Sequence, residues 1–159
     1  MGGWSRQENR RRSVWGDARN GTAAEKLQVV MRQLTTLTAQ CRISTLELPS
    51  CEMKGQDAER LAGVLAQCPA LAHLDLSGNS NVGAAGAESL AGVLGQCREL
   101  VHLNLSYIKI GAGGAERLAG LLAQCTVLAH LDLEYNGIEG VGKGMLRASW
   151  RGEASGLVL

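Results

Sequence analysis

The chain has 159 residues, of which 45% are hydrophobic and 19% charged, a balance typical of one soluble globular domain. Its formal net charge of +1 argues against nucleic acid or an anionic membrane as the main partner, because both select a clustered basic surface. The sequence has neither an apolar run of membrane-spanning length nor an apolar signal segment at its start, so we expect a cytoplasmic protein.

Residues 1–21 are expected to form an irregular basic tail, since the short cluster Arg10 to Arg12 is typical of a solvated chain end. The sequence then predicts a helix over residues 22–41. Thr22 can cap this helix together with Glu25 three residues later, and apolar residues follow at helical spacing. We expect the helix to be a half-repeat that covers the first open edge of a domain spanning residues 22–159.

A ten-residue segment dominates the rest of the chain. It reads QCPALAHLDL at residues 67–76, and it returns as QCRELVHLNL at 96–105 and QCTVLAHLDL at 124–133, with a weaker copy at 40–48. The equivalent leucines follow one another at steps of 28, 29 and 28 residues: Leu46, Leu74, Leu103 and Leu131. A fixed period of this length indicates a solenoid.

Each repeat is predicted to contain a strand, a turn and a helix. Apolar and polar residues alternate in the strand, which directs its leucines into the core. In the second repeat a turn is expected from Gly78 to Gly86, followed by a helix over residues 87–97, and similar helices are predicted at 58–68 and 115–125. One glycine recurs inside each helix, which suggests close approach of neighbouring helices at three positions: Gly63, Gly92 and Gly120.

The end of the chain departs from the regular repeat. A diverged helix is predicted over about residues 141–150, after which Leu157 and Leu159 take the places of the paired leucines of a fifth strand. The domain would thus contain about four repeats and a shortened terminal unit around residues 150–159, with Trp150 covering the far edge.

Four of the five cysteines share one place in the repeat: Cys41, Cys68, Cys97 and Cys125. Equivalent positions on stacked helices lie about 10 Å apart, which is too far for a disulfide or a shared zinc ion. We therefore expect these cysteines to be reduced and to serve as small buried apolar side chains.

The repeats resemble leucine-rich repeats of the ribonuclease-inhibitor type, which also occur in NOD-like receptors. Two sets of residues match the motif LxxLxLxxN: Leu71, Leu74, Leu76 and Asn79, then Leu128, Leu131, Leu133 and Asn136. The resemblance covers about 115 residues, from Gln40 onward. It implies an α/β fold, a right-handed solenoid forming a short curved arc, with parallel strands on the concave face and helices on the convex face.

Two departures from the repeat pattern have expected consequences. The asparagine column holds Cys51, Asn79, Ile108 and Asn136, so the third repeat should lose the side chain that hydrogen-bonds its turn. The second repeat has one extra residue near Ser80 and Asn81, which should bulge the loop without changing the register of the leucines.

The polar residues that alternate with the core leucines are candidates for binding a partner. All three histidines occupy one column, an acidic and amide column runs beside it, and two tyrosines follow the strands. The predicted partner-binding residues are His73, Asp75, Ser77, His102, Asn104, Ser106, Tyr107, His130, Asp132, Glu134 and Tyr135. Tyrosine is enriched where partners bury surface, although duplication of one surface residue would also produce such columns.

The histidine column also suggests a surface that responds to metal or to pH. Equivalent residues on parallel strands lie about 4.8 Å apart, so the three imidazoles should stack. Their mutual repulsion lowers the histidine pKa values, whereas Asp75 and Asp132 raise them, so the charge of this face could change near neutral pH.

No catalytic or cofactor-binding site is predicted. Residues 137–144 match the phosphate-loop pattern G-x-x-x-x-G-K, but Gly144 stands where a serine or threonine must hold magnesium.

We expect a non-catalytic module that binds another protein, with no nucleic-acid or membrane partner, as a monomer or a fragment of a longer repeat protein. The alternative is a regulator of an enzyme, because Ran GTPase-activating proteins and ribonuclease inhibitor share the repeat type that the chain resembles.

Overall fold

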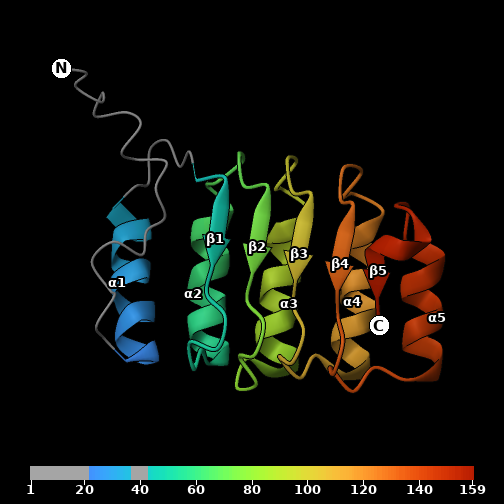
Figure 1. The fold of residues 1–159 in the computed structure, drawn as a ribbon, viewed down its shortest axis with the longest axis horizontal. Helices are drawn as coiled ribbons and strands as arrows, with labels where there is room; N and C mark the ends of the chain where they lie inside the picture. Colours follow the sequence, from blue (N-terminus) through green and yellow to red (C-terminus); the bar gives the residue numbers. More distant parts are fainter. Residues whose placement is uncertain (1–21, 37–42) are drawn as a thin grey trace.

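A computed structural model describes residues 22–36 and 43–159. Helices and strands alternate through these residues in two layers, with the strands side by side in one layer and the helices in the other (Figure 1). The elements in chain order are α1 (Ala23–Thr36), β1 (Thr45–Glu47), α2 (Gly55–Leu65), β2 (His73–Asp75), α3 (Gly83–Leu94), β3 (His102–Asn104), α4 (Gly111–Leu122), β4 (His130–Asp132), α5 (Gly140–Ser149), the short 3-10 helix η3 (Ala154–Gly156) and β5 (Leu157–Val158).

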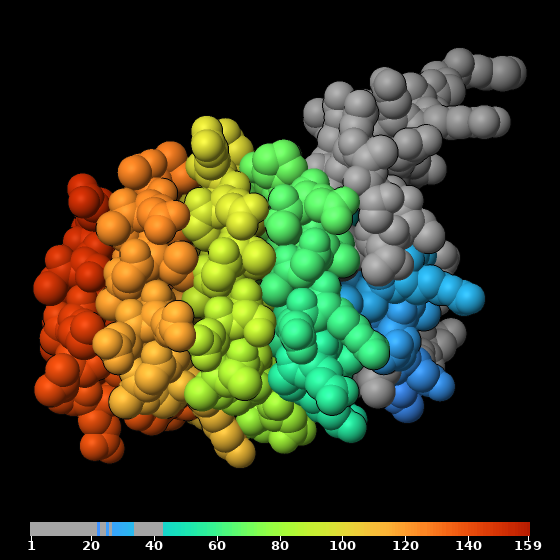
Figure 2. All heavy atoms as spheres, turned by 180° about the vertical axis from the view of Figure 1, so that it is seen from behind, coloured from blue at the N-terminus to red at the C-terminus, as the bar shows by residue number. Residues whose placement is uncertain are grey.

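All five strands form one open parallel sheet in the order β1-β2-β3-β4-β5. The central leucine of each strand pairs with the equivalent leucine of the next, from Leu46 through Leu74, Leu103 and Leu131 to Leu157. The predicted repeat register is therefore confirmed, including the fifth strand. Seen from the helix side, each repeat forms its own band across the molecule (Figure 2).

The core lies between the sheet and the helices. The leucines at the strand centres are buried, with 3% exposure at Leu46 and none at Leu74 or Leu131. They meet the buried leucines of the helices, among them Leu61, Leu90, Leu118 and Leu146. Burial of each such side chain contributes about 1.5 to 3 kcal/mol, so the strand positions are fixed mainly by which alternate residues are apolar.

The helices begin earlier than predicted. The expected turn from Gly78 to Gly86 ends at Val82, because α3 starts at Gly83 and includes the glycine-rich stretch in its first turn. Gly83 has a φ of +64°, a backbone conformation that glycine adopts without the strain of a side chain.

The expected close approach at Gly63, Gly92 and Gly120 is wrong, because a Cβ atom at any of them would meet nothing within 4 Å. A different glycine column lies at the helix contact. At Gly86 a Cβ would lie 3.1 Å from Ala58 Cβ, and at Gly142 it would lie 3.4 Å from Ala115 Cβ. Small residues at these positions let neighbouring helices pack closely.

Asn79 joins the first two repeats through its side-chain amide, which is 1% exposed. Its Oδ1 accepts hydrogen bonds from the backbone amides of Cys51 at 2.9 Å and Met53 at 3.0 Å, both in the preceding repeat. Its Nδ2 donates to the carbonyl oxygens of Leu48 at 2.8 Å and Leu76 at 2.7 Å. One buried side chain thus satisfies backbone groups of two adjacent repeats.

Asn136 makes the same set of contacts between the third and fourth repeats. It accepts from the amides of Ile108 and Ile110 at 3.0 and 3.2 Å, and donates to the carbonyls of Leu105 and Leu133 at 2.7 and 2.9 Å. The turn of the third repeat is therefore hydrogen-bonded by a side chain after all. The expectation was wrong because each asparagine bonds the turn of the repeat before its own. Ile108 takes the place of the asparagine in the third repeat, so it is the turn of the second repeat that lacks these bonds.

The second repeat is also the one with the extra residue. Its turn is held by backbone bonds instead: Val82 N donates to Asn79 O at 3.0 Å, and Gly83 N donates to Ile108 O at 2.9 Å. The leucine register on either side is unchanged, as predicted. The turn of the second repeat therefore carries both departures from the pattern. It has the longer loop, and it lacks the asparagine bonds because Ile108 replaces the asparagine of the third repeat.

The first helix begins with the predicted cap. Thr22 N donates to Glu25 Oε2 at 2.7 Å, and Glu25 N donates to Thr22 Oγ1 at 3.3 Å. The bond from the Thr22 backbone, together with the Thr22 hydroxyl, lowers the pKa of the Glu25 carboxyl. The helix is described as far as Thr36, so its predicted extension to residue 41 and the predicted tail 1–21 lie outside the described residues.

Trp150 packs against the core at the last repeat, and its Nε1 donates to Glu153 O at 2.8 Å.

Two of the cysteines in the repeated column are free, Cys97 and Cys125, and burial raises the pKa of the Cys97 thiol to about 11. Cys68 is disulfide-bonded, so the expectation of reduced thiols is wrong there. Cys41 lies outside the described residues.

Candidate partner-binding face

The strand face is the side of the sheet that points away from the helices. It consists of the residues that alternate with the core leucines: Thr45, Glu47, His73, Asp75, Ser77, His102, Asn104, Ser106, His130, Asp132 and Glu134. Because the strands are parallel and in register, each residue lies beside its equivalent in the next repeat. The sheet thus brings together most of the residues predicted to bind a partner.

The three histidines form a continuous stack across three strands. The ring centroids of His73 and His102 lie 5.9 Å apart with 25° between the planes, and those of His102 and His130 lie 4.5 Å apart with 10°. Partial burial lowers the pKa of His102, as do its two neighbours His130 and His73, while Asp75 and Asp132 raise it less. The central ring therefore favours its neutral form.

The acidic and amide column shapes the ends of the strands. Asp75 Oδ1 accepts from Ser77 N at 2.8 Å, and Asp132 Oδ1 accepts from Glu134 N at 2.9 Å. Each aspartate thus fixes the backbone two residues later and still presents its charge at the surface. Both side chains are half-buried.

Asn104 fills the same place in the third repeat. Its Oδ1 accepts from the backbone amide of Ser106 at 3.0 Å and from the Ser106 hydroxyl at 2.8 Å. Ser106 is only 8% exposed, so it offers a partner far less surface than the prediction assumed. Its role is to complete the turn beside Asn104.

Tyr107 and Tyr135 lie directly beyond the strand face. If side chains went on alternating between the two faces of the sheet, each tyrosine ring would be buried like the core leucine two residues before it. Tyr107 and Tyr135 have φ values of +57° and +56°, however, and this left-handed backbone breaks the alternation. The rings are 50% and 66% exposed and stack on each other with centroids 4.2 Å apart. Burial, the Tyr135 hydroxyl and the charge of Glu134 raise the pKa of the Tyr107 phenol.

Sequence reasoning placed the tyrosines beside the strands but missed their left-handed backbone. One signal was present: the same column contains Gly78, with a φ of +73°. Glycine adopts that conformation freely, whereas a bulky residue rarely does.

Comparison with known families agrees with this geometry. The sequence model of the leucine-rich repeat matches residues 67–91 and 124–142, which contain the strand, turn and helix start of the second and fourth repeats. This is a leucine-rich-repeat protein. No curated protein matches the chain. Alternating helices and parallel strands in one open sheet form the solenoid typical of such repeats.

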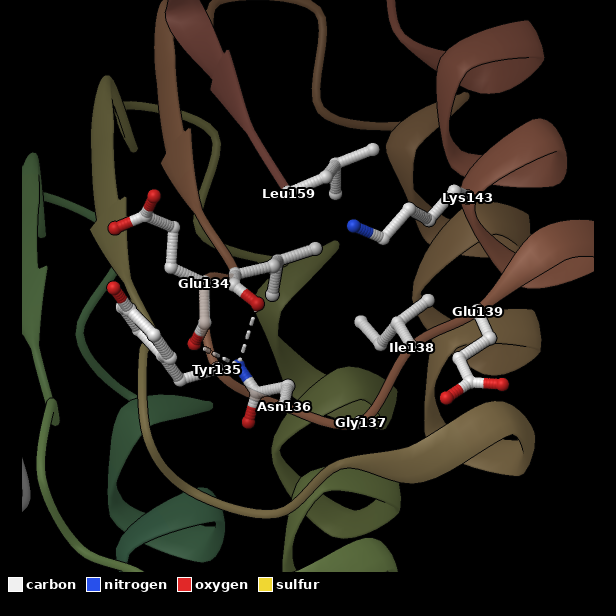
Figure 3. Close-up of a pocket in the computed structure, with 9 residues that line it drawn as sticks. Glu134, Tyr135, Asn136, Gly137, Ile138, Glu139, Lys143 and Leu159 are labelled. Carbon is white, nitrogen blue, oxygen red and sulfur yellow. Dashed lines mark hydrogen bonds between the residues drawn. The ribbon is translucent and has the colours of Figure 1, made fainter.

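The leucine-rich-repeat protein has a surface pocket of about 420 Å³ beside β4 and α5, at the end of the sheet. Figure 3 shows Lys143 extending over it toward Leu159, while the side chains of Glu134 and Tyr135 point to the opposite side. The residues that line the pocket include one basic residue, Lys143, and two acidic ones, Glu134 and Glu139, a balance that does not favour phosphate. The lysine of the G-x-x-x-x-G-K pattern therefore lies in a setting unlike a phosphate loop.

Two further findings concern ligands and membranes. Within residues 22–36 and 43–159, no three histidine, cysteine or acidic side chains are grouped so as to hold a metal ion. The stacked imidazoles are parallel, so their nitrogens do not converge on one point. In the same part of the chain, no helix combines the length and apolar character that crossing a membrane requires.

Proposed function

We propose that this leucine-rich-repeat protein is a non-catalytic module that binds another protein through its strand face and the adjoining pair Tyr107 and Tyr135. The observation that carries the proposal is the exposed tyrosine pair, because both rings are stacked, exposed and held in a backbone conformation that disfavours bulky side chains. Such strain persists where the side chain has a use. Stacked rings have little conformational entropy left to lose when a partner covers them.

Repeat proteins of this class generally mediate contacts between proteins, which supports the same conclusion. We further propose that the repeats are of the ribonuclease-inhibitor type, as in NOD-like receptors. Each of the four repeats contributes a full helix of 10 to 12 residues, whereas shorter leucine-rich repeats have room for only a 3-10 turn.

The test compares three versions of the full chain as bait in cell lysate. The first is the parent and the second changes His73, His102, His130, Tyr107 and Tyr135 to Ala. The third is a helix-face control with Glu88→Ala and Arg117→Ala, which removes an exposed ion pair of 2.5 Å. Circular dichroism establishes that all three are folded.

A protein captured by the parent and the control, but not by the strand-face variant, is the expected result. Its direct binding is then measured with the purified partner. Equal capture by the strand-face variant would assign binding to another surface.

A regulator of an enzyme remains a second candidate, on the observation that the strand face presents a row of titratable groups that an enzyme surface could recognise. The captured partner decides this point. If it is an enzyme, its activity is measured with and without the parent chain.

A further inference from the structure

The strand face is acidic although the whole chain is nearly neutral. It contains four carboxylates, on Glu47, Asp75, Asp132 and Glu134, and neither lysine nor arginine among its described positions. The chain as a whole has 16 basic and 15 acidic residues. Charge is therefore distributed unevenly, and the acidic excess lies on the surface proposed to bind.

The nearest cationic residues along the chain do not belong to this face. Among the described residues, Arg98 lies in the turn before β3, Lys54 and Lys109 lie in the turns beyond the strands, and Lys143 lies on α5. The one ion pair found among the described residues joins Arg117 and Glu88 on the helix side. The carboxylates of the strand face thus form a field of one sign, which attracts cations and repels the phosphates of nucleic acid.

Aromatic surface adjoins these carboxylates. Tyr107 and Tyr135 stack on each other, so each ring has one outer face. The next residue in the column beyond Tyr107 is Gly78, which has no side chain to cover that ring. Tyr135 is 66% exposed. Glu134 immediately precedes Tyr135, so a partner that contacts this ring also meets a carboxylate.

We propose that the strand face binds an extended, arginine-rich segment of a partner protein, with guanidinium groups paired to its carboxylates and stacked on the tyrosines. This inference rests on the proposed function of the same face and specifies the partner's chemistry. Arginine fits better than lysine because its planar guanidinium pairs with a carboxylate through two hydrogen bonds and stacks on aromatic rings. A lysine ammonium offers only a strongly hydrated point charge.

The experiment measures the affinity of synthetic peptides for the full chain by fluorescence anisotropy at physiological salt. The probes alternate serine with arginine, lysine or glutamate, and are long enough to cross all five strands. We expect the arginine peptide to bind about tenfold more tightly than the lysine peptide, and the glutamate peptide not to bind.

Three variants locate the binding. Glu47→Gln with Glu134→Gln should weaken binding of both cationic peptides, because two charges are removed without a change of shape. Tyr107→Ala with Tyr135→Ala should remove the preference for arginine while binding to lysine persists. Glu59→Gln, Glu88→Gln and Glu116→Gln together remove exposed acids of the helices and should change neither affinity.

The chain's own residues 1–21, with five arginines, are a competitor to test in the 159-residue chain by changing Arg10, Arg11 and Arg12 to Gln. Tighter peptide binding by that variant would support an arginine-selective face. Equal affinity for the arginine and lysine peptides, or undiminished binding by the Glu47 and Glu134 variant, would overturn the inference. The proposed function would survive that result if lysate capture still depended on the strand face.

Discussion

Tyr107 and Tyr135 stack with their ring centroids 4.2 Å apart while both residues keep a left-handed backbone. A left-handed conformation costs a bulky residue about 1 to 2 kcal/mol. Stacking of the two rings stabilises the fold by about 0.5 to 1.5 kcal/mol. Two strained residues therefore cost about 2 to 4 kcal/mol, more than one stack contributes, so the tyrosine pair does not stabilise the fold.

Tyr135→Gly removes the strain of one residue and also the whole stack, and these two contributions are of similar size. It should therefore change the free energy of unfolding by less than about 1 kcal/mol. Tyr135→Ala should be the less stable of the two, since alanine loses the stack and keeps the strain. Urea denaturation of the two variants measures the difference. Greater stability of the alanine variant would mean that the left-handed backbone is not retained.

The sequence was sufficient to predict the ladder of leucines, because the period of 28 or 29 residues and the alternation within each strand are both determined by where apolar residues recur. It was not sufficient to predict where the asparagines bond. Asn79 contacts Cys51 and Met53 across 28 and 26 residues, and that direction follows only from the three-dimensional stacking of repeats.

The candidate site was predictable to a similar extent. Register alone brings His73, His102 and His130 together, so the stack could be expected. The burial of Ser106 and the outward turn of Tyr107 could not, because each depends on local hydrogen bonds and backbone angles at the strand end.

The two glycine columns of the helices should respond oppositely to alanine. Gly120 is exposed and a Cβ there meets nothing within 4 Å, so Gly120→Ala should raise the free energy of unfolding by up to about 1 kcal/mol. At Gly114 a Cβ would collide with Ile110 Cγ2, so Gly114→Ala should lower it by about 1 to 3 kcal/mol. Thermal and urea unfolding of both variants give the two signs, and equal signs would show that Ile110 makes room for the added methyl group.

Asn136→Ala should destabilise the fold by at least about 3 kcal/mol. The change leaves the buried amides of Ile108 and Ile110 and two carbonyls without their side-chain partner, and an unsatisfied buried group costs about 1 to 3 kcal/mol. The matched control is Asn81→Ala in the exposed part of the longer loop, which should change stability by less than about 0.5 kcal/mol. Equal losses in the two variants would show that the buried bonds are not the source of the effect.

Stability should fall as the solution is acidified through the titration of His102. Burial, together with its neighbours His130 and His73, lowers the pKa of His102 below its ordinary value of 6.5, against the opposing effect of Asp75 and Asp132. The unfolded chain therefore binds the proton more readily than the folded chain. This contribution to stability is fully present above pH 6.5 and is lost as the pH falls below it, toward the pKa of the folded state.

The measurement is a proton NMR titration of the imidazole resonances, with urea unfolding at neutral and mildly acidic pH. His130→Gln removes one of the two neighbouring imidazoles, so the pKa of His102 should rise toward its ordinary value in that variant. His102→Gln should flatten the fall in stability on acidification. If the parent's His102 titrated above 6.5 instead, the two aspartates would dominate its environment, and acidification through that range would stabilise the fold.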